Sequence, residues 1–280
     1  MIIIADSGST KTDWIIFNDT QKENFKTKGI NPFFLDKKAV ELDILSHFPK
    51  NIKRNSVKAV YFYGPACSTS ERCQIVEAAL SPVFSNAQVF VDSDLTGAAR
   101  ALFQKKSGIA CILGTGSNSG LYNGERIIEN ITSTGYILGD EGSGAHLGLE
   151  LVKKFINHQL EPEIENAFFK YYNLSAEQII DRVYKGEYPN RFLAHFAPFI
   201  KENLNQPSIH KIAYHSFLSF IEIHVLPYKN SQKEPIAMVG SIAFYFKDLI
   251  YEIAKEKNLN IGKILSHPIS DLAQYHGLKL

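Results

Sequence analysis

The sequence lacks the features of nucleic-acid-binding and membrane proteins. Its 30 basic and 29 acidic residues give a net charge of +1, and they form no long run of one sign. Nucleic-acid binding therefore has no electrostatic basis. No apolar run approaches the ~18 residues of a membrane span, and residues 1–5 lack the basic start of a signal peptide. We expect neither a nucleic acid nor a membrane as partner.

Cysteine is also scarce, with three residues that have no CxxC pattern and no metal-ligand spacing, namely Cys67, Cys73 and Cys111. This odd count in a chain of 280 residues is typical of a reducing compartment, and we expect a cytoplasmic protein. Apolar residues are abundant, because 45% of the chain is hydrophobic and 12% is aromatic. One or two domains with a sizeable core are expected.

The N-terminal stretch Met1–Phe17 predicts a hairpin around a turn of small residues. An apolar strand, Ile2–Ala5, runs into Asp6–Thr12, and a second apolar run, Trp14–Phe17, follows. Small side chains at the tip would let backbone N–H groups close on an anion. Asp6 ends the strand, where a carboxylate could hold a hydrated Mg²⁺. An ordinary hairpin with a Ser/Gly turn fits these residues equally well.

A second stretch repeats this pattern, since the apolar strand Ile109–Leu113 runs into the small polar turn Gly114–Gly120. Two such units predict a duplicated α/β core with nucleotide phosphates between the halves. The expected domains are residues 1–105 and 106–280, although the boundary depends only on the polar residues 104–107. Residues 147–225 have mostly helical spacing and predict a helical insertion in the second domain.

Three turns or strand ends in the first half carry candidate site residues. The turn Gly29–Pro32 contains Asn31, the strand over residues 57–63 ends at Gly64, and the strand over residues 87–91 leads to Asp92 and Asp94 before a helix of small residues. An Asp at a helix start is either an N-cap or a general base, and phosphoryl transfer needs a group that orients the attacking hydroxyl. Turn chemistry alone would explain Asn31.

The second half contains two further turns that lead into helices. Residues 135–145 place glycines, Asp140 and Glu141 before a helix expected over His146–Asn157, which predicts a loop with exposed N–H groups at the helix start. A capped helix with flexible glycines is the alternative. The strand Pro235–Val239, the turn Gly240–Ser241 and a helix to about residue 257 form a candidate adenosine platform.

Five segments in order resemble the superfamily of sugar kinases, actin and heat-shock chaperones: DSGSTKT, INP at residues 30–32, VDSDLTGA, LGTGSNS with the later GDEGSGAHLG, and MVGS. Within it, the chain resembles the eukaryotic-type N-acetylglucosamine kinase branch, which includes activators of 2-hydroxyacyl-CoA dehydratases. The resemblance implies an α/β fold of two actin-like ATPase domains with a duplicated ribonuclease H-like core.

The resemblance also implies a function, the ATP- and Mg²⁺-dependent phosphorylation of an amino sugar. The expected acceptor is the 6-hydroxyl of N-acetylglucosamine, with N-acetylmuramic acid and glucosamine as alternatives, and a homodimer is expected. Two alternatives of another class are an activator ATPase, which would need cysteines for an iron–sulfur cluster, and a nucleotide-dependent regulatory protein without kinase activity.

By the same resemblance, Asp94 is the catalytic base and Asp92 its structural neighbour. The residues implied in binding ATP and its phosphates are Ser7, Gly8, Ser9, Thr10, Lys11, Gly114, Thr115, Gly116, Ser117, Gly240 and Ser241. Those implied in binding the sugar are Asn31, Gly64, Asn118, Gly135 and Asp140, and those implied in holding Mg²⁺, directly or through water, are Asp6 and Asp140. The small-residue segment usual near the C-terminus is replaced by Pro268–Ala273, which leaves the adenine contacts open.

Overall fold

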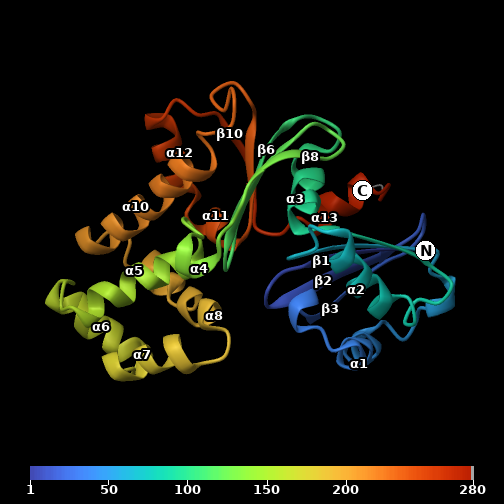
Figure 1. The fold of residues 1–280 in the computed structure, drawn as a ribbon, viewed down its shortest axis with the longest axis horizontal. Coiled ribbons are helices and arrows are strands. Elements are labelled where there is room, and N and C mark those ends of the chain that lie inside the picture. Colours follow the sequence, from blue (N-terminus) through green and yellow to red (C-terminus); the bar gives the residue numbers. More distant parts are fainter. Residues whose placement is uncertain (279–280) are drawn as a thin grey trace. The chain divides into compact units, whose positions relative to one another are not determined.

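The computed structural model describes residues 1–278, which form two compact units (Figure 1). The first unit contains Met1–Gly108, Tyr122–Ile128 and the segment that begins at His267, and the second contains Ile109–Leu121 and Glu129–Ser266. The domain boundary expected at residue 105 remains a prediction. The compact units differ from it mainly because the C-terminal segment returns to the first unit.

The sheet of the first unit has the strand order β3-β2-β1-β4-β5. β1 pairs antiparallel with β2 and parallel with β4, and β4 pairs parallel with β5. The strands are β1 (Ile2–Ser7), β2 (Lys11–Phe17), β3 (Lys22–Lys28), β4 (Ala59–Gly64) and β5 (Gln88–Ser93). The helices are α1 (Lys37–His47), α2 (Ser70–Leu80), α3 (Asp94–Phe103) and α13 (Ile269–Tyr275), with short 3-10 turns at Pro32–Phe34 and Arg54–Ser56.

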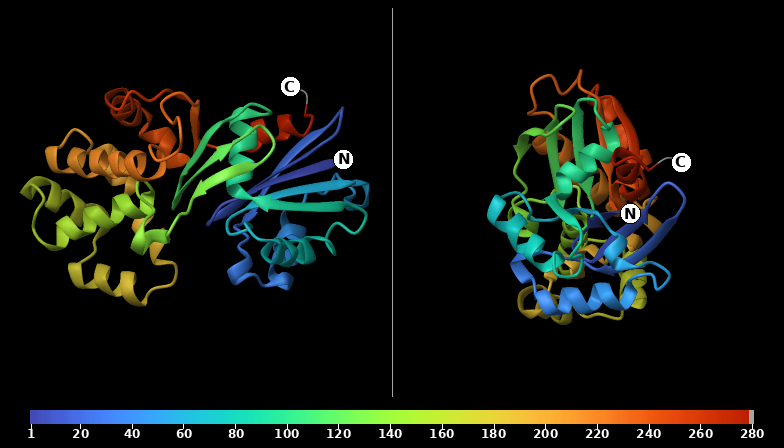
Figure 2. Two further views of the ribbon diagram at one scale, coloured as in Figure 1. Left: turned by 45° about the horizontal axis from the view of Figure 1, so that its top comes forward. Right: turned by 90° about the vertical axis from the view of Figure 1, so that its right-hand side faces the viewer.

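Both faces of this sheet are covered by helices. Successive side chains of a strand point to opposite faces, so neighbouring residues of β1 pack in different clusters. Ile3 and Ala5 of β1 pack in one apolar cluster with residues of α1 and α2. Ile4 packs in another cluster with residues of α3 and α13. In both views of Figure 2 the red helix α13 lies beside the blue strands of this unit. The nearly continuous apolar run of β1 follows from this two-sided burial.

The sheet of the second unit has the order β10-β9-β6-β7-β8, which repeats the first sheet strand for strand when read from β8. This repeat confirms the predicted duplicated α/β core. The strands are β6 (Gly108–Leu113), β7 (Ser117–Tyr122), β8 (Ile127–Ile131), β9 (Ile236–Val239) and β10 (Ile261–Leu265). The helices after β9 are α11 (Ser241–Tyr245) and α12 (Lys247–Glu256).

The predicted helical insertion lies between β8 and β9 of the second unit. Its helices are α4 (Gly135–Leu138), α5 (Gly144–Ile156), α6 (Pro162–Tyr172), α7 (Ala176–Lys185), α8 (Pro189–Ala194), α9 (Ala197–Glu202) and α10 (Pro207–His224). Its aromatic side chains form a core, in which the centroid of the buried Phe168 ring lies 4.5 Å from that of Phe155 and 5.3 Å from that of Phe196.

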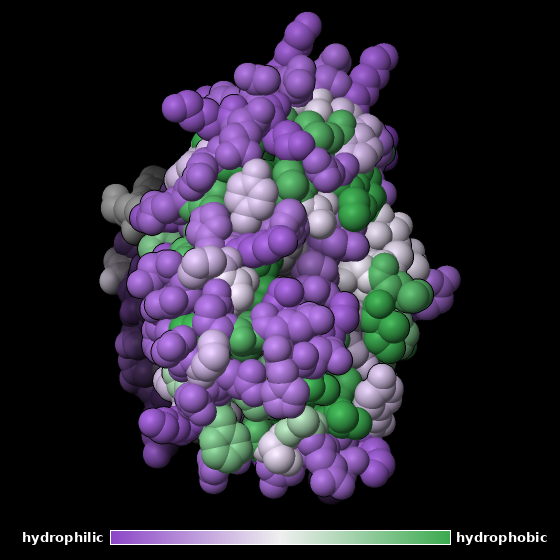
Figure 3. Space-filling model, turned by 90° about the vertical axis from the view of Figure 1, so that its left-hand side faces the viewer, coloured by the Kyte–Doolittle hydropathy of each residue, from purple (hydrophilic) through white to green (hydrophobic). Residues whose placement is uncertain are grey.

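Figure 3 shows a largely hydrophilic face of the molecule, with small hydrophobic groups between the hydrophilic residues. None of the helices among residues 1–278 could span a membrane.

Leu272→Ala should destabilise the first unit, because Leu272 of α13 is fully buried against the β1–β2 face of the sheet. A buried Leu→Ala change costs about 2–5 kcal/mol. The fluorescence of Trp14, the one tryptophan of the chain, reports on this unit during denaturant unfolding. Leu42→Ala, at an exposed position of α1, is the control. Equal unfolding midpoints for the two variants would contradict the assignment of α13 to the first unit.

Candidate active site

The turn between β1 and β2 is packed closely against Gly29, whereas the space beside Gly8 is open. The Gly8 N–H donates to the Lys11 carbonyl at 2.8 Å, and the Gly29 N–H donates to the Thr10 carbonyl at 3.1 Å. A Cβ at Gly29 would lie 2.3 Å from the Gly8 oxygen, so only glycine allows this close backbone approach. A Cβ at Gly8 would meet only the Lys11 oxygen, at 3.7 Å. Space therefore remains at Gly8 for a ligand.

Two side chains of this turn are engaged within the protein. The buried Ser7 hydroxyl lies 2.9 Å from Thr12 Oγ1 and accepts a hydrogen bond from the Ile30 N–H at 3.0 Å. Lys11 Nζ lies 2.8 Å from Asp13 Oδ2. The Ser7 side chain thus fixes the hairpin to the segment that carries Asn31. The phosphate-binding roles of Ser7 to Lys11 remain predictions.

Asp6 is a half-buried carboxylate at the end of β1, opposite Asp13 in the strand register. Its pKa is raised to about 7; burial is the largest cause, the charges of Asp13 and Asp94 also raise the pKa, and Lys11 lowers it. No group of three or more His, Cys, Asp or Glu residues in the described chain could hold a metal ion alone. The role of the Asp6 carboxylate toward a hydrated Mg²⁺, which prefers oxygen ligands and keeps several waters, remains a prediction.

Asp94 is the first residue of α3, and Ser93 is its N-cap, since the Thr96 N–H donates to Ser93 Oγ at 3.1 Å. The alternative in which Asp92 or Asp94 caps this helix is therefore wrong. Asp94 Oδ1 accepts a hydrogen bond from the Leu95 N–H at 2.8 Å. Burial is the largest cause that raises its pKa, to about 6. A carboxylate with this pKa suits a general base, which works best near the ambient pH.

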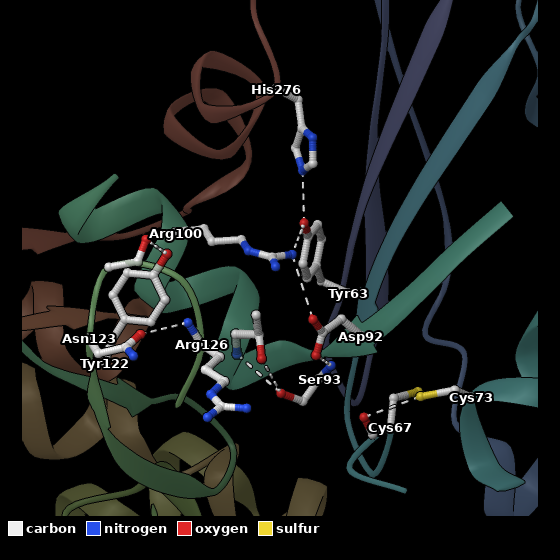
Figure 4. A network of polar contacts seen from close by, with 12 residues as sticks. Tyr63, Cys67, Cys73, Asp92, Ser93, Arg100, Tyr122, Asn123, Arg126 and His276 are labelled. Atoms are coloured by element: carbon white, nitrogen blue, oxygen red, sulfur yellow. Dashed lines mark hydrogen bonds and ion pairs between the residues drawn. The ribbon is translucent and has the colours of Figure 1, made fainter. Parts of the chain in front are cut away.

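Asp92, two residues before Asp94, has different partners. Its Oδ1 accepts from the Ser93 N–H at 2.7 Å, and its Oδ2 lies 3.5 Å from Arg100 Nη1 (Figure 4). Arg100 also donates to the Tyr63 hydroxyl at 2.7 Å. The Asp92 carboxylate is thus engaged in an ion pair, and its purely structural role remains a prediction. The sequence analysis missed Arg100 and Tyr63, for which no motif gives a signal.

The loop Gly114–Ser117 of the second unit is tied to the start of α5. The Gly144 N–H donates to the Gly114 carbonyl at 2.8 Å, and the Ala145 N–H donates to the Thr115 carbonyl at 3.1 Å. The expectation of exposed N–H groups at this helix start is therefore wrong for these two amides. The helix also begins at Gly144 rather than His146. These bonds hold the loop carbonyls and leave the space beside Gly114 open, where a Cβ would meet nothing within 4 Å.

Asp140 supports the same loop from behind. Its Oδ1 accepts from the Ser133 hydroxyl at 2.7 Å and from the Ser117 N–H at 3.4 Å. A Cβ at Gly116 would lie 2.9 Å from Asp140 Oδ2, so this glycine makes room for the carboxylate. The Ser117 hydroxyl is buried without a hydrogen-bond partner in the described chain. A role of Asp140 toward sugar or Mg²⁺ remains a prediction.

Most of the other candidate residues have local structural partners. Asn31 Oδ1 accepts from the Phe33 N–H at 3.0 Å, which is the turn chemistry left open above, and Asn118 Oδ1 accepts from Asn130 Nδ2 at 3.0 Å. A Cβ at Gly64 would lie 2.4 Å from the Phe62 ring. Gly135 has a positive φ of 78° and open space around it. Their substrate-binding roles remain predictions.

Gly240 lies directly against the loop of the second unit. It has a φ of 120°, and a Cβ there would lie 2.1 Å from the Leu113 oxygen and 3.3 Å from the Gly114 nitrogen. The turn Gly240–Ser241 and the loop Gly114–Ser117 are thus brought together, and their roles toward adenosine and phosphate remain predictions. The single helix expected to about residue 257 is wrong, because the chain breaks it at Phe246 into α11 and α12.

Further buried polar groups escaped the sequence analysis. His224 Nε2 lies 2.9 Å from Glu141 Oε2, next to Asp140 in the chain, and the His224 carbonyl accepts from the Ser119 hydroxyl at 2.7 Å. These pairs join residues far apart in sequence, so no spacing pattern could indicate them. His146 of α5 has a partner on α10, since its Nδ1 lies 2.7 Å from Ser216 Oγ.

Comparison with solved structures gives a relative over the whole chain. The structure of a "putative N-acetylglucosamine kinase" from Porphyromonas gingivalis is 40% identical, with a TM-score of 0.94, and the match covers 99% of this chain and 98% of that one. A protein of the same description from Chromobacterium violaceum is 15% identical, with a TM-score of 0.75 and 98% coverage of both chains. No protein-family model and no curated protein sequence matches the chain.

A third structure shares the fold and contains ligands. It is a ROK family glucokinase from Streptomyces griseus in complex with glucose and AMPPNP, 13% identical, with a TM-score of 0.59 and 98% coverage of both chains. At this identity the likeness concerns the fold alone.

The matched variants Gly114→Ala and Gly116→Ala distinguish an effect on ATP binding from an effect on the packing of the loop. Gly114→Ala should leave the unfolding midpoint unchanged but weaken ATP binding by about tenfold, or ~1.4 kcal/mol, because its Cβ would enter the space proposed for phosphate. Gly116→Ala should lower stability by about 1–3 kcal/mol, because its Cβ meets Asp140. Thermal unfolding and calorimetric titration with ATP measure both effects. Wild-type ATP affinity in Gly114→Ala would contradict the loop assignment.

Proposed function

We propose that this chain, which belongs to the N-acetylglucosamine kinase-like family of sugar kinases, transfers the γ-phosphoryl group of ATP to the 6-hydroxyl of N-acetylglucosamine. The observation that carries the proposal is the half-buried Asp94 carboxylate at the start of α3, whose pKa is raised to about 6. A carboxylate in this state can accept a hydroxyl proton near neutral pH. The relative that is 40% identical over the whole chain supports the acceptor class.

Phosphoryl transfer asks the protein mainly for positioning and charge stabilisation. In the proposed reaction Asp94 orients the sugar hydroxyl and takes its proton as the sugar oxygen bonds to the γ-phosphorus and the bond from that phosphorus to ADP breaks. Asn31 and Asn118 would use their remaining amide N–H groups to bind sugar oxygens, since their Oδ1 atoms accept hydrogen bonds within the protein. Gly64, Gly135 and Asp140 are the other proposed sugar contacts.

The turn at Gly8 and the loop at Gly114 would each hold nucleotide phosphates, with Gly240 and Ser241 beside the adenosine. The open space at Gly8 and Gly114 supports this, as does the buried Ser117 hydroxyl, which lacks a partner in the described chain. Asp6 and Asp140 are the proposed Mg²⁺ ligands, directly or through water. When bound, Mg²⁺ would neutralise charge on the phosphates. We also propose a cytoplasmic homodimer.

Other acceptors and activities differ in what they require. N-acetylmuramic acid and glucosamine stay as alternative acceptors within the same chemistry. An activator ATPase would need accessible thiolates for its cluster, but Cys67 and Cys111 are buried, and burial raises the pKa of the Cys67 thiol to about 12. A regulatory protein without kinase activity would have no use for a carboxylate such as Asp94.

A panel of sugars with ATP and Mg²⁺, read as ADP release, tests the proposal. N-acetylglucosamine should exceed plain glucose in kcat/KM by roughly 10⁴-fold, because a site built to pair buried polar groups rejects analogues that leave them unpaired. Asp94→Asn should lower kcat by about 10²–10⁴ while ATP and sugar bind almost normally. Asp92→Asn is the matched control and should cost far less.

Three results would contradict parts of this proposal. Wild-type turnover in Asp94→Asn with an inactive Asp92→Asn would mean that the base is misassigned. Full activity in both variants would contradict the mechanism. No sugar-dependent ADP release by the wild type would contradict the kinase function itself.

The raised pKa of Asp94 also predicts how stability depends on pH. The folded pKa of about 6 lies above the ordinary 3.8, so the folded protein binds more protons than the unfolded chain between these values. The Asp94 carboxylate therefore lowers the free energy of unfolding as pH rises through about 6, and this effect is absent below about pH 4. Asp94→Asn should unfold like the wild type in acid and be more stable by about 1–2 kcal/mol at about pH 8.

Thermal unfolding of ligand-free protein across this pH range measures the difference between variant and wild type, which cancels the titration of groups that do not interact with Asp94. The pKa of Asp6, which the charge of Asp94 raises, falls in the variant and changes the difference in the same direction. Asp92→Asn should instead be less stable than the wild type at about pH 8, because it weakens the ion pair with Arg100. A difference between Asp94→Asn and wild type that does not change with pH would contradict the raised pKa.

A further inference from the structure

A chain of polar contacts connects α3, the helix that begins with Asp94, to the C-terminal helix α13 (Figure 4). Arg100 Nη1 donates to the Tyr63 hydroxyl at 2.7 Å, and the same hydroxyl lies 2.7 Å from Nε2 of His276. Arg100 also lies 3.5 Å from Asp92. Tyr63 thus stands between the end of α13 and the helix that carries the proposed base.

The chemistry of these groups fixes the direction of the chain. Arginine can only donate, so the Tyr63 oxygen accepts from Arg100 and its single proton goes to His276 Nε2. Burial, together with Arg100, lowers the pKa of His276 to about 4, so its ring is neutral at physiological pH and can accept that proton. The His276 ring also stacks on Tyr61, with centroids 3.9 Å apart. The Tyr63 hydroxyl therefore has a partner in each role: it accepts from Arg100 and donates to His276.

Tyr63 also packs directly on α3. A Cβ at Gly97 would lie 2.9 Å from both Cβ and Cγ of Tyr63, so the helix backbone touches this side chain about one turn after Asp94. Tyr63 is buried, and in the strand register it is paired with Asp92. A second tie joins the two helices, since Gln104 Nε2 donates to the Asp271 carbonyl at 3.1 Å.

We propose that Tyr63 and His276 are positioning residues for the catalytic base, an inference that rests on the proposed function. Arg100 Nε is buried without a hydrogen-bond partner in the described chain, and Arg100 Nη1 faces both the Tyr63 hydroxyl, at 2.7 Å, and Asp92, at 3.5 Å. When the Tyr63 hydroxyl is removed, Arg100 Nη1 loses the closer of these two partners and moves toward Asp92. That movement displaces the residues directly before Asp94. The C-terminal helix thereby sets the orientation of a base more than 170 positions earlier in the chain.

Steady-state kinetics of Tyr63→Phe test the positioning role. The variant should lose kcat by roughly tenfold or more, because small displacements of a catalytic group are costly, with KM for ATP and sugar within about twofold of wild type. In the Asp94→Asn background, Tyr63→Phe should cost nothing further, because the base through which it acts is already absent. The control is Tyr172→Phe, at the last residue of α6, which removes a hydroxyl that donates to the His195 carbonyl; it should be neutral.

The other end of the chain offers a conservative pair. His276→Gln keeps a side-chain oxygen that can accept from Tyr63, and it should retain more kcat than His276→Leu, which cannot accept. Equal kcat for the two variants, or equal losses from Tyr63→Phe with and without Asp94, would overturn the inference.

Hydrogen exchange gives a readout that does not need activity. The Leu95 and Thr96 amides, which donate to Asp94 and Ser93, should exchange faster in Tyr63→Phe, while amides of the second unit should not change. Unchanged exchange at these amides would overturn the inference even in an active enzyme. If the wild type phosphorylated no sugar, the proposed function would fail, and the exchange result would then decide whether Tyr63 orders the start of α3.

Discussion

The burial of two carboxylates, Asp6 and Asp94, is the constraint on which the first unit depends. Desolvation raises their pKa values to about 7 and about 6, which makes the charged forms costly in the folded protein. Asp94 loses its proton first, and its charge then helps to raise the pKa of Asp6. The surrounding structure must hold both groups in place against this cost. Such a cost is typical of functional sites.

The glycines of the loops are of two kinds. Gly29, Gly116 and Gly240 lack a Cβ because other parts of the protein occupy its place, namely the hairpin turn, the Asp140 carboxylate and the Leu113 carbonyl. Gly8 and Gly114 face open space instead. The first kind builds the loops, and the second kind leaves room for a ligand. The proposed phosphate contacts depend on the second kind.

Patterns among residues close in sequence predicted those parts of the fold that such residues determine. The hairpin, the repeated strand and turn at Gly114, and the insertion all follow from apolar periodicity and small-residue turns. Partners distant in sequence could not be predicted, because side-chain pairing across more than 200 positions, as between Tyr63 and His276, leaves no periodic signal. The segment Pro268–Ala273 shows this best. Its composition matched no nucleotide-binding pattern, and its role in packing on the first unit emerged only from the fold.

The state of Asp94 is the central claim, and carboxyl ¹³C NMR of aspartate-labelled, ligand-free protein measures it most directly. The account predicts that two aspartate carboxyls titrate far above the ordinary 3.8, at about 6 and about 7. The signal with the lower pKa should vanish in Asp94→Asn, and the pKa of Asp6 should fall in the same variant because a neighbouring charge is lost. Aspartates that all titrate near 3.8 would contradict the account.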